Sequence, residues 1–166
     1  MKGKTILVVE DNELNMKLVK GLIKIGNYDM LEAVDAESGI QLVREQRPDL
    51  VLMDIQLPGM DGLSATKIIK KDPSLRDIPI VALTSYAMQG DKEKALEAGC
   101  TGYIAKPIDT RKFLETVSQY LEDDNLEDNP VKGWNMKSKQ RILFIDDEPL
   151  KVKIVASVST PLKIAA

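Results

Sequence analysis

The chain has 166 residues, of which 43% are apolar, enough for the core of one ordinary domain with a remainder, and its formal net charge is −3. No stretch gathers the dense Lys and Arg patch that binding to a nucleic-acid backbone requires, and the lone Cys100 excludes an intrachain disulfide and a thiolate zinc site. The apolar run near the N-terminus is too short for a signal peptide or a membrane span, so we expect a soluble, cytoplasmic protein without direct contact to nucleic acid or membrane.

The first fifty residues alternate apolar runs with segments of helical periodicity. Residues 6–9 are a continuous apolar run, which is typical of a strand buried on both faces of a parallel sheet. A helix is predicted after it, closed by a left-handed C-cap at Gly26. Residues 29–33 predict a second strand, and Asp35 is the expected N-cap of a second helix that ends before Pro48. The apolar stripe of the first helix consists of Leu14, Leu18, Leu22 and Ile25.

The same alternation continues to residue 122. Strands are predicted at residues 50–53, 78–83 and 103–105, and helices at residues 63–71, at 91–98 and after the cap Asp109. The segment after residue 54 contains two turn dipeptides, Pro58-Gly59 and Asp61-Gly62. Five strand–helix alternations predict an α/β fold, a doubly wound five-stranded parallel sheet with helices on both faces. The buried side of the last helix is expected to carry Phe113, Leu114, Val117, Tyr120 and Leu121.

The composition changes after residue 122, where acidic residues and then lysines follow without a period. Residues 123–140 are therefore predicted to be a linker. Residues 142–148 then repeat residues 6–12, with an apolar run and an acid pair in register. Chance similarity is the alternative, but we expect residues 141–166 to be the truncated start of a second copy of the domain at residues 1–122. One strand cannot bury a core, so we expect weak order there and a piece of a longer protein.

Polar side chains follow four of the predicted strands: Glu10 and Asp11, Asp54, Thr84, and Lys106. Because the carboxyl ends of parallel strands share one edge, these side chains should meet there. Three carboxylates suit Mg2+, which prefers oxygen ligands and bridges to phosphate. Asp54 could serve as a nucleophile that carries an acyl phosphate, or only as a cap or metal ligand. A hydroxyl at 84 and an ammonium at 106 could then contact the phosphoryl group.

The order of these residues, with the stretches Leu52-Met53-Asp54 and Lys106-Pro107 and the loop at residues 57–62, resembles the CheY-like receiver domain of two-component response regulators. The resemblance runs from Lys4 to about Glu122 and implies a flavodoxin-like fold with strand order 2-1-3-4-5. It implies that Asp54 is the phosphoacceptor and that Thr84 and Lys106 contact the phosphoryl group. It also implies a cis Lys106–Pro107 bond. The implied Mg2+ ligands are Glu10, Asp11, Asp54 and the backbone carbonyl of Gln56.

The resemblance assigns a switch as well. Tyr103 would turn inward when Thr84 is drawn toward the phosphate, although an ordinary core tyrosine is the alternative. Gln56 and Tyr86 occupy the positions that in this family influence hydrolysis of the acyl phosphate. Because a large ring at position 86 could shield the phosphate from water, we expect a long-lived phosphorylated state.

The chain contains no histidine, so the phosphohistidine donor that receiver domains use must come from elsewhere. The implied partners are a sensor histidine kinase or a histidine phosphotransfer protein, and a downstream output domain or protein; a homodimer is also possible. By the same resemblance, the donor would dock over the first helix and the loop after the fifth strand. The expected contacts are Asn15, Met16, Val19 and Pro107-Ile108, with core burial as the alternative for Met16 and Val19.

We expect a phosphorylation-dependent signalling domain that catalyses its own phosphoryl transfer and hydrolysis, rather than an enzyme acting on other substrates. A Mg2+-dependent phosphatase with an aspartyl nucleophile is one alternative. Such an enzyme needs a second acid near Asp54, and Gln56 stands at the obvious position. A pseudo-receiver that only binds proteins is the other alternative, and the competent residues at all the chemical positions argue against it.

Overall fold

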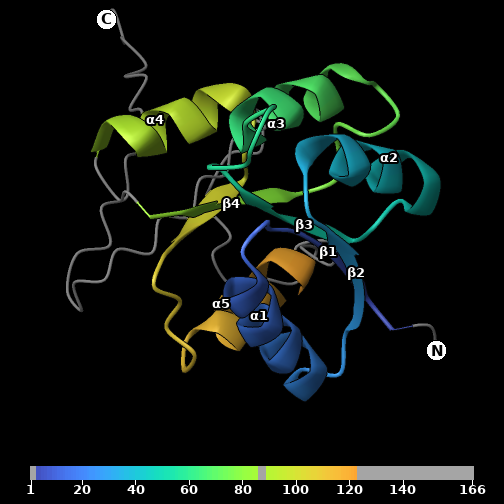
Figure 1. Ribbon diagram of the computed structural model, residues 1–166. Helices are drawn as coiled ribbons and strands as arrows, with labels where there is room; N and C mark the ends of the chain where they lie inside the picture. Colours follow the sequence, from blue (N-terminus) through green and yellow to red (C-terminus); the bar gives the residue numbers. More distant parts are fainter. Residues whose placement is uncertain (1–2, 86–88, 123–166) are drawn as a thin grey trace, which may run out of the picture.

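The computed structural model describes residues 3–85 and 89–122. Tyr86, the predicted linker at 123–140 and the predicted second domain at 141–166 lie outside the described residues. Strands and helices alternate along the described chain (Figure 1). They are β1 (Thr5–Val9), α1 (Glu13–Ile25), β2 (Asp29–Ala33), α2 (Ala36–Gln46), β3 (Leu50–Asp54), α3 (Gly62–Lys71), β4 (Ile80–Thr84), α4 (Gln89–Ala98), β5 (Gly102–Ala105) and α5 (Phe113–Glu122).

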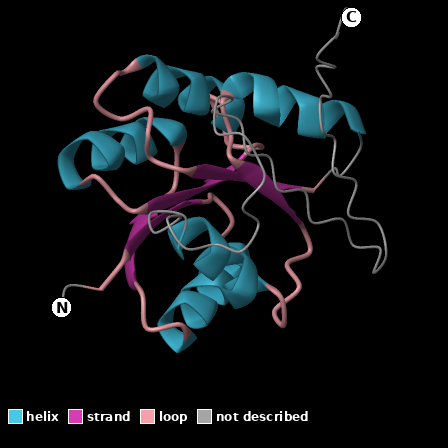
Figure 2. Cartoon of the chain, turned by 180° about the vertical axis from the view of Figure 1, so that it is seen from behind, coloured by secondary structure: helices cyan, strands magenta, loops and turns pink. Residues whose placement is uncertain are grey.

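The five strands form one sheet in the order β2-β1-β3-β4-β5, and every neighbouring pair is parallel. This confirms the predicted doubly wound α/β fold. Helices α1 and α5 cover one face of the sheet, and α2, α3 and α4 cover the other (Figures 1 and 2). Because all strands run the same way, the residues that follow β1, β3, β4 and β5 meet at one edge.

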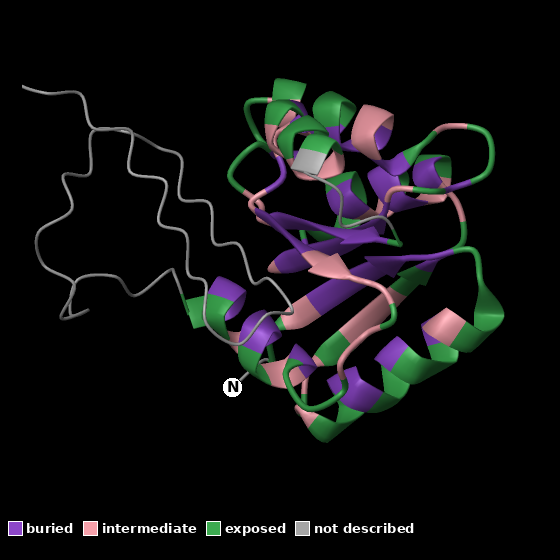
Figure 3. Ribbon diagram, turned by 90° about the vertical axis from the view of Figure 1, so that its left-hand side faces the viewer, coloured by how far each residue is buried: buried purple, intermediate pink, exposed green. Residues whose placement is uncertain are grey.

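The central strands are the most buried part of the molecule. All five residues of β3 and all five of β4 are buried, whereas the edge strand β2 buries only Ala33 (Figure 3). Continuous apolar runs such as residues 6–9 therefore belong to strands with a helical layer on each side, as predicted. Two hydrophobic clusters result, one on each face of the sheet. This rigid centre fixes the strand ends that carry the polar side chains.

Most of the predicted apolar stripe of α1 is exposed at the surface rather than buried. Leu14 is 75% exposed and Ile25 is 69% exposed, and Leu18 is also exposed. The side packed on the sheet consists of Met16, Val19, Leu22 and Ile23. The helix begins after its N-cap, Asn12, whose side chain accepts hydrogen bonds from the N–H groups of Leu14 and Asn15. Of the predicted stripe, only Leu22 belongs to the core.

The predicted left-handed cap at Gly26 is wrong by one residue. Gly26 has φ −74°, and the left-handed residue is Asn27, with φ +57°. Asparagine tolerates this conformation better than most residues. Gly26 is needed for space instead, because a Cβ there would lie 2.8 Å from the Tyr28 ring and 2.8 Å from the Leu114 side chain.

Other predicted helix ends are present. Asp35 caps α2 by accepting a 2.7 Å hydrogen bond from the Ser38 N–H, and Gly99 follows α4 with φ +102°. Asp109 caps the turn that leads into α5 rather than α5 itself, because its carboxylate accepts from the Arg111 N–H while the regular helix begins at Phe113. Within residues 3–85 and 89–122, no helix combines the length and apolarity that crossing a bilayer requires.

Candidate phosphoryl-transfer site

The structure brings four of the predicted site residues together at the carboxyl edge of the sheet. Glu10 and Asp11 follow β1, Asp54 is the last residue of β3, and Lys106 follows β5. The Lys106 Nζ lies 2.6 Å from Glu10 Oε2 and 2.8 Å from Asp54 Oδ2. One ammonium group thus contacts two carboxylates from strands that are far apart in the sequence.

The three carboxylates form a compact oxygen cluster. One oxygen each of Glu10, Asp11 and Asp54 lies within 4.8 Å of the others. Glu10 is 1% exposed and Asp54 is 3% exposed, whereas Asp11 faces solvent. Like charges this close repel unless a cation lies between them, and the single ammonium of Lys106 balances only one of the three. The donor set is therefore one that fits a hard divalent cation such as Mg2+, with one side open to solvent.

Burial and pairing shift the protonation of this cluster. Burial raises the pKa of the Glu10 carboxyl, although hydrogen bonds from Lys106 and from the Asn12 N–H oppose that shift. For Lys106, burial acts to lower the pKa of the ammonium, but the hydrogen bonds to Asp54 and Glu10 outweigh it and raise the pKa. Lys106 therefore stays charged at neutral pH and remains available to a phosphoryl oxygen.

Backbone groups fix the orientation of both buried acids. The Asn12 N–H donates to Glu10 Oε1 at 3.0 Å, and the Gln56 N–H donates to Asp54 Oδ1 at 2.9 Å. Gln56 itself is exposed beside the site. Together with the contacts from Lys106, these bonds give each buried carboxylate a donor on both of its oxygens. Asp54 is thus held in one orientation at the end of a fully buried strand.

Sequence reasoning missed the role of Gly62. It was predicted as part of a turn dipeptide, but it is the first residue of α3 and its N–H donates to the Ile55 carbonyl at 3.0 Å. A Cβ at this position would lie 1.9 Å from the carbonyl oxygen of Asp54. The close approach of α3 to β3 therefore requires glycine here. The signal in the sequence is a glycine at the start of a helix directly after its N-cap, Asp61.

The remaining predicted residues are placed as follows. Thr84 is the last residue of β4 and is 5% exposed, and its carbonyl accepts a 2.7 Å hydrogen bond from the Lys106 N–H. Tyr103 is 3% exposed and packs in the hydrophobic cluster beneath α2, α3 and α4. The Lys106–Pro107 bond is cis, as the resemblance implied.

The predicted donor contacts need correction. Val19 is fully buried and Met16 is 8% exposed, so the prediction that a partner touches them is wrong and the core interpretation holds. Both residues point toward the sheet because of the rotation of α1. The accessible apolar side chains on the same helix are Leu14, Leu18 and Ile25, of which Leu14 and Leu18 lie in its N-terminal half.

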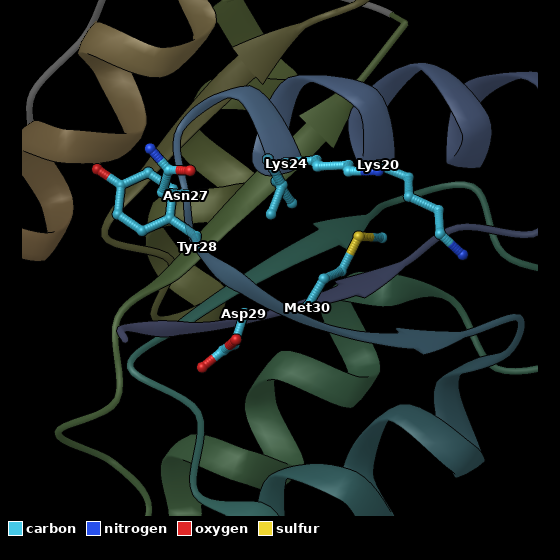
Figure 4. A pocket seen from close by; sticks show the side chains of 7 residues that line it. Lys20, Lys24, Asn27, Tyr28, Asp29 and Met30 are labelled. Carbon is cyan, nitrogen blue, oxygen red and sulfur yellow. The ribbon is translucent and has the colours of Figure 1, made fainter. Parts of the chain in front are cut away.

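Two hollows lie near α1, and they differ in their relation to the site. A groove of about 260 Å3 adjoins the acid cluster, with Glu10, Asp11 and Lys17 in its wall. A larger hollow of about 360 Å3 lies between the C-terminal half of α1 and the start of β2 (Figure 4). Lys20, Lys24 and Tyr28 line it. Because this larger hollow is at the amino end of β2, it is not part of the site at the carboxyl edge.

A five-stranded parallel sheet in this order, with an acid cluster, a buried aspartate and a lysine at its carboxyl edge, defines a receiver domain. The chain belongs to the response regulator receiver domain family, whose model matches residues 6–118. Its relatives include the polar-differentiation response regulator DivK of Brucella anthropi, which is 48% identical over 120 residues, covering 72% of this chain and 98% of that protein. DivK of Brucella ovis is similar to the same extent.

Solved structures agree with this assignment. The receiver domain of a Pseudomonas aeruginosa sensor histidine kinase, with a magnesium ion coordinated in its active-site cleft, is 35% identical with a TM-score of 0.67 and covers 72% of this chain and 98% of that one. A response regulator of Chloroflexus aurantiacus is 28% identical with a TM-score of 0.70, at the same coverage. The chemotaxis response regulator CheY4 of Vibrio cholerae, at 23% identity, shares the fold, with a TM-score of 0.68 and coverage of 72% and 99%.

The family sets the class of function. Receiver domains are signalling domains of two-component systems; they bind Mg2+ at an acidic pocket, accept a phosphoryl group on an aspartate and interact with a histidine kinase or a phosphotransfer protein. The cluster of Glu10, Asp11 and Asp54 has the donor atoms that such a pocket requires.

Proposed function

We propose that Asp54 accepts a phosphoryl group from an external phosphohistidine, in a Mg2+-dependent transfer that the domain itself catalyses, and that this event changes how the domain binds a downstream partner. The observation that carries the proposal is the position of the Asp54 carboxylate. It ends a buried strand, it contacts Lys106 at 2.8 Å, and it lies within 4.8 Å of the Glu10 and Asp11 oxygens.

The residues of the chain divide the work of the transfer. Asp54 supplies the attacking oxygen: an oxygen–phosphorus bond forms while the nitrogen–phosphorus bond of the donor breaks, and imidazole leaves neutral if its other nitrogen carries a proton. Lys106 stays an ammonium, so it can contact the Asp54 carboxylate before the transfer and a phosphoryl oxygen after it. The Thr84 hydroxyl, at the end of the neighbouring strand, is proposed to contact another phosphoryl oxygen.

Mg2+ would be held by the carboxylates of Glu10, Asp11 and Asp54 and by the Gln56 carbonyl. When bound, it supplies the positive charge that neutralises the phosphoryl oxygens in the transition state. The hydrogen bonds from Asn12 and Gln56 keep the buried acids oriented for this role.

The phosphorylated state is proposed to be long-lived. The position two residues after Asp54 holds an amide, Gln56, rather than an acid that would activate water. The residue two positions after Thr84 is Tyr86, whose ring would limit the access of water. Slow loss of phosphate after removal of the donor, with Mg2+ present and no phosphatase, is the expected result. Loss within the mixing time would contradict it.

The donor protein is proposed to dock over the surface of α1 next to the acid cluster. Leu14 and Leu18 are exposed there, and Pro107 is exposed in the loop after β5. The two leucines are four residues apart and therefore lie on the same face of the helix, where they offer apolar surface to a partner. The Thr84 and Tyr103 side is proposed to communicate the phosphorylated state to the output partner. The repeat of residues 6–12 at 142–148 supports the proposal of a second receiver domain after a linker.

Mass spectrometry of the intact chain tests the central proposal. The protein is incubated with acetyl phosphate, with Mg2+ or with a chelator, and we expect the mass of one phosphoryl group only when Mg2+ is present. Asp54→Asn should abolish it, whereas the matched control Asp77→Asn, at an exposed aspartate on the α3–β4 connection, should not. A modification that persists in Asp54→Asn overturns the assignment of Asp54. Sustained release of inorganic phosphate favours the phosphatase, and no modification favours a module that only binds proteins.

A further inference from the structure

Helix α4 is attached to the sheet by unusually little apolar surface. Among its described side chains, the buried ones are Ala95 and Ala98, whereas α1 buries four larger residues. It lies at the outer end of its helical layer, beside α3 (Figure 1). Because alanine buries little area, hydrophobic packing contributes less to the position of α4 than to that of the other helices. A specific contact can therefore have a large influence on where this helix rests.

One such contact connects the N-terminal half of α4 to β5. The Lys92 Nζ lies 4.9 Å from the centre of the Tyr103 ring. An ammonium within about 6 Å of a ring centre is attracted to the negative face of the ring, and more strongly when it is partly removed from water. Lys92 is half-buried and Tyr103 is 3% exposed, so the contact between them is partly removed from water.

We propose that Lys92 is a positioning residue for the switch tyrosine. Its ammonium holds the Tyr103 ring in the inward position and connects the N-terminal half of α4 to β5. The ring therefore points inward in the same conformational state in which α4 is packed against β5. Tyr103 pairs in register with Ala82 of β4, two residues before Thr84. A displacement of Thr84 toward the phosphoryl group would then change the position of α4, because the Tyr103 ring and Lys92 connect β5 to this helix. The consequence for signalling rests on the proposed function; the contact itself does not.

The charge of Lys92, rather than its aliphatic stem, carries this inference. A lysine stem can also cover a ring by apolar packing alone. Lys92→Met keeps most of the stem and removes the ammonium, whereas Lys92→Arg keeps a cation that stacks well on aromatic faces. The two variants therefore separate the charge from the packing. Lys94→Met is the matched control, because Lys94 is on the same helix and its side chain is 67% exposed.

The experiment measures the exposure of the Tyr103 ring in the full chain without Mg2+ or a phosphate donor. Tyrosines are replaced with 3-fluorotyrosine, the Tyr103 fluorine signal is assigned by its loss in Tyr103→Phe, and its relaxation by a soluble paramagnetic agent is recorded. Loss of the cation should raise the outward population relative to the inward one by about two- to fivefold in Lys92→Met. Lys92→Arg should restore the wild-type value, and Lys94→Met should leave it unchanged.

Equal ring exposure in wild type and Lys92→Met overturns the proposal, and so does an equal change in Lys94→Met. A second arm adds Mg2+ and beryllofluoride, which mimics the phosphoryl group. If the wild-type spectrum does not respond while the effect of Lys92→Met persists, the assignment of Lys92 is supported and the proposed function of Asp54 fails. If the spectrum responds but Lys92→Met has no effect in either arm, the proposed function stands and the role of Lys92 is overturned.

Discussion

Gly62→Ala is expected to damage both the stability and the chemistry of the domain, for one steric reason. The added Cβ would lie 1.9 Å from the carbonyl oxygen of Asp54, whereas ordinary contacts begin at 3.4 Å. The separation must therefore grow by about 1.5 Å, the difference between these two distances. The obstacle is the backbone of β3, which is buried along its whole length and cannot move aside as a flexible side chain would.

Both magnitudes follow from that displacement. Overpacking of a tight interior costs about 1–3 kcal/mol, so the free energy of unfolding should fall by about that amount. A shift of about 1 Å in a reacting group costs about a hundredfold in rate, so phosphorylation of Asp54 should slow by about that factor. Urea denaturation measures the first effect. The rate of phosphorylation by acetyl phosphate with Mg2+ measures the second.

Gly21→Ala is the matched control for this prediction. Gly21 lies within α1, and nothing lies within 4 Å of the position that its Cβ would take. The substitution should raise the free energy of unfolding by about 0.5–1 kcal/mol, because alanine loses less backbone entropy in a helix. If Gly62→Ala is as stable as Gly21→Ala and is phosphorylated at the wild-type rate, the steric reasoning is refuted.

Three further predictions concern other residues. Without metal, Lys106→Met should lower the free energy of unfolding by about 3 kcal/mol, since two buried acids lose their shared cation. Saturating Mg2+ should restore about 2–3 kcal/mol in the same urea titration. If Mg2+ does not stabilise the variant, the proposed metal site is contradicted. Hydrogen bonds from the Ser38 hydroxyl and N–H lower the pKa of Asp35, so its contribution is present above the ordinary value of 3.8 and is lost as pH falls below it. The difference in the free energy of unfolding between wild type and Asp35→Asn should therefore be largest near neutral pH and should shrink as the pH falls below 3.8. Burial raises the pKa of the Cys100 thiol to about 11, so alkylation near neutral pH should be slow and should follow unfolding in urea; fast labelling of the folded protein would contradict this.

The parts of the fold that the sequence predicts well are those with a local cause. Continuous apolar runs locate the central strands, because a strand covered by helices on both faces has no solvent-facing side that would carry polar residues. The role of Asp35 as an N-cap is predictable because a cap is a local interaction between a side chain and the nearby backbone. The meeting of Glu10, Asp54 and Lys106 is predictable for another reason: parallel strands place their carboxyl ends at one edge whatever the loops do.

The parts that the sequence does not predict depend on neighbours that are distant along the chain. Leu14, Leu18 and Ile25 have helical spacing, yet the competing set that includes Met16 and Val19 is the one that faces the sheet. Spacing alone does not distinguish two apolar stripes on one helix. The need for glycine at 62 likewise arises from the approach of α3 to the Asp54 carbonyl. A glycine directly after the N-cap Asp61 marks the position, but this local pattern does not show which backbone group lies against it.

The charge balance of the site suits a sheet edge that binds a cation and a phosphoryl group together. Glu10, Asp11 and Asp54 carry three formal negative charges and Lys106 carries one positive charge, which leaves an excess of two negative charges. A divalent cation removes that excess, and a phosphoryl group on Asp54 then brings new negative charge to the position where the ammonium of Lys106 already lies. Because the two acids with the least exposure are oriented by backbone N–H groups, little reorganisation is needed when these charges change. The strand beside Asp54 is β4, which ends at Thr84, and Tyr103 lies one strand further on, in register with Ala82 of β4. We therefore expect the free energy of phosphorylation to act first on Thr84 and, through β4, on Tyr103.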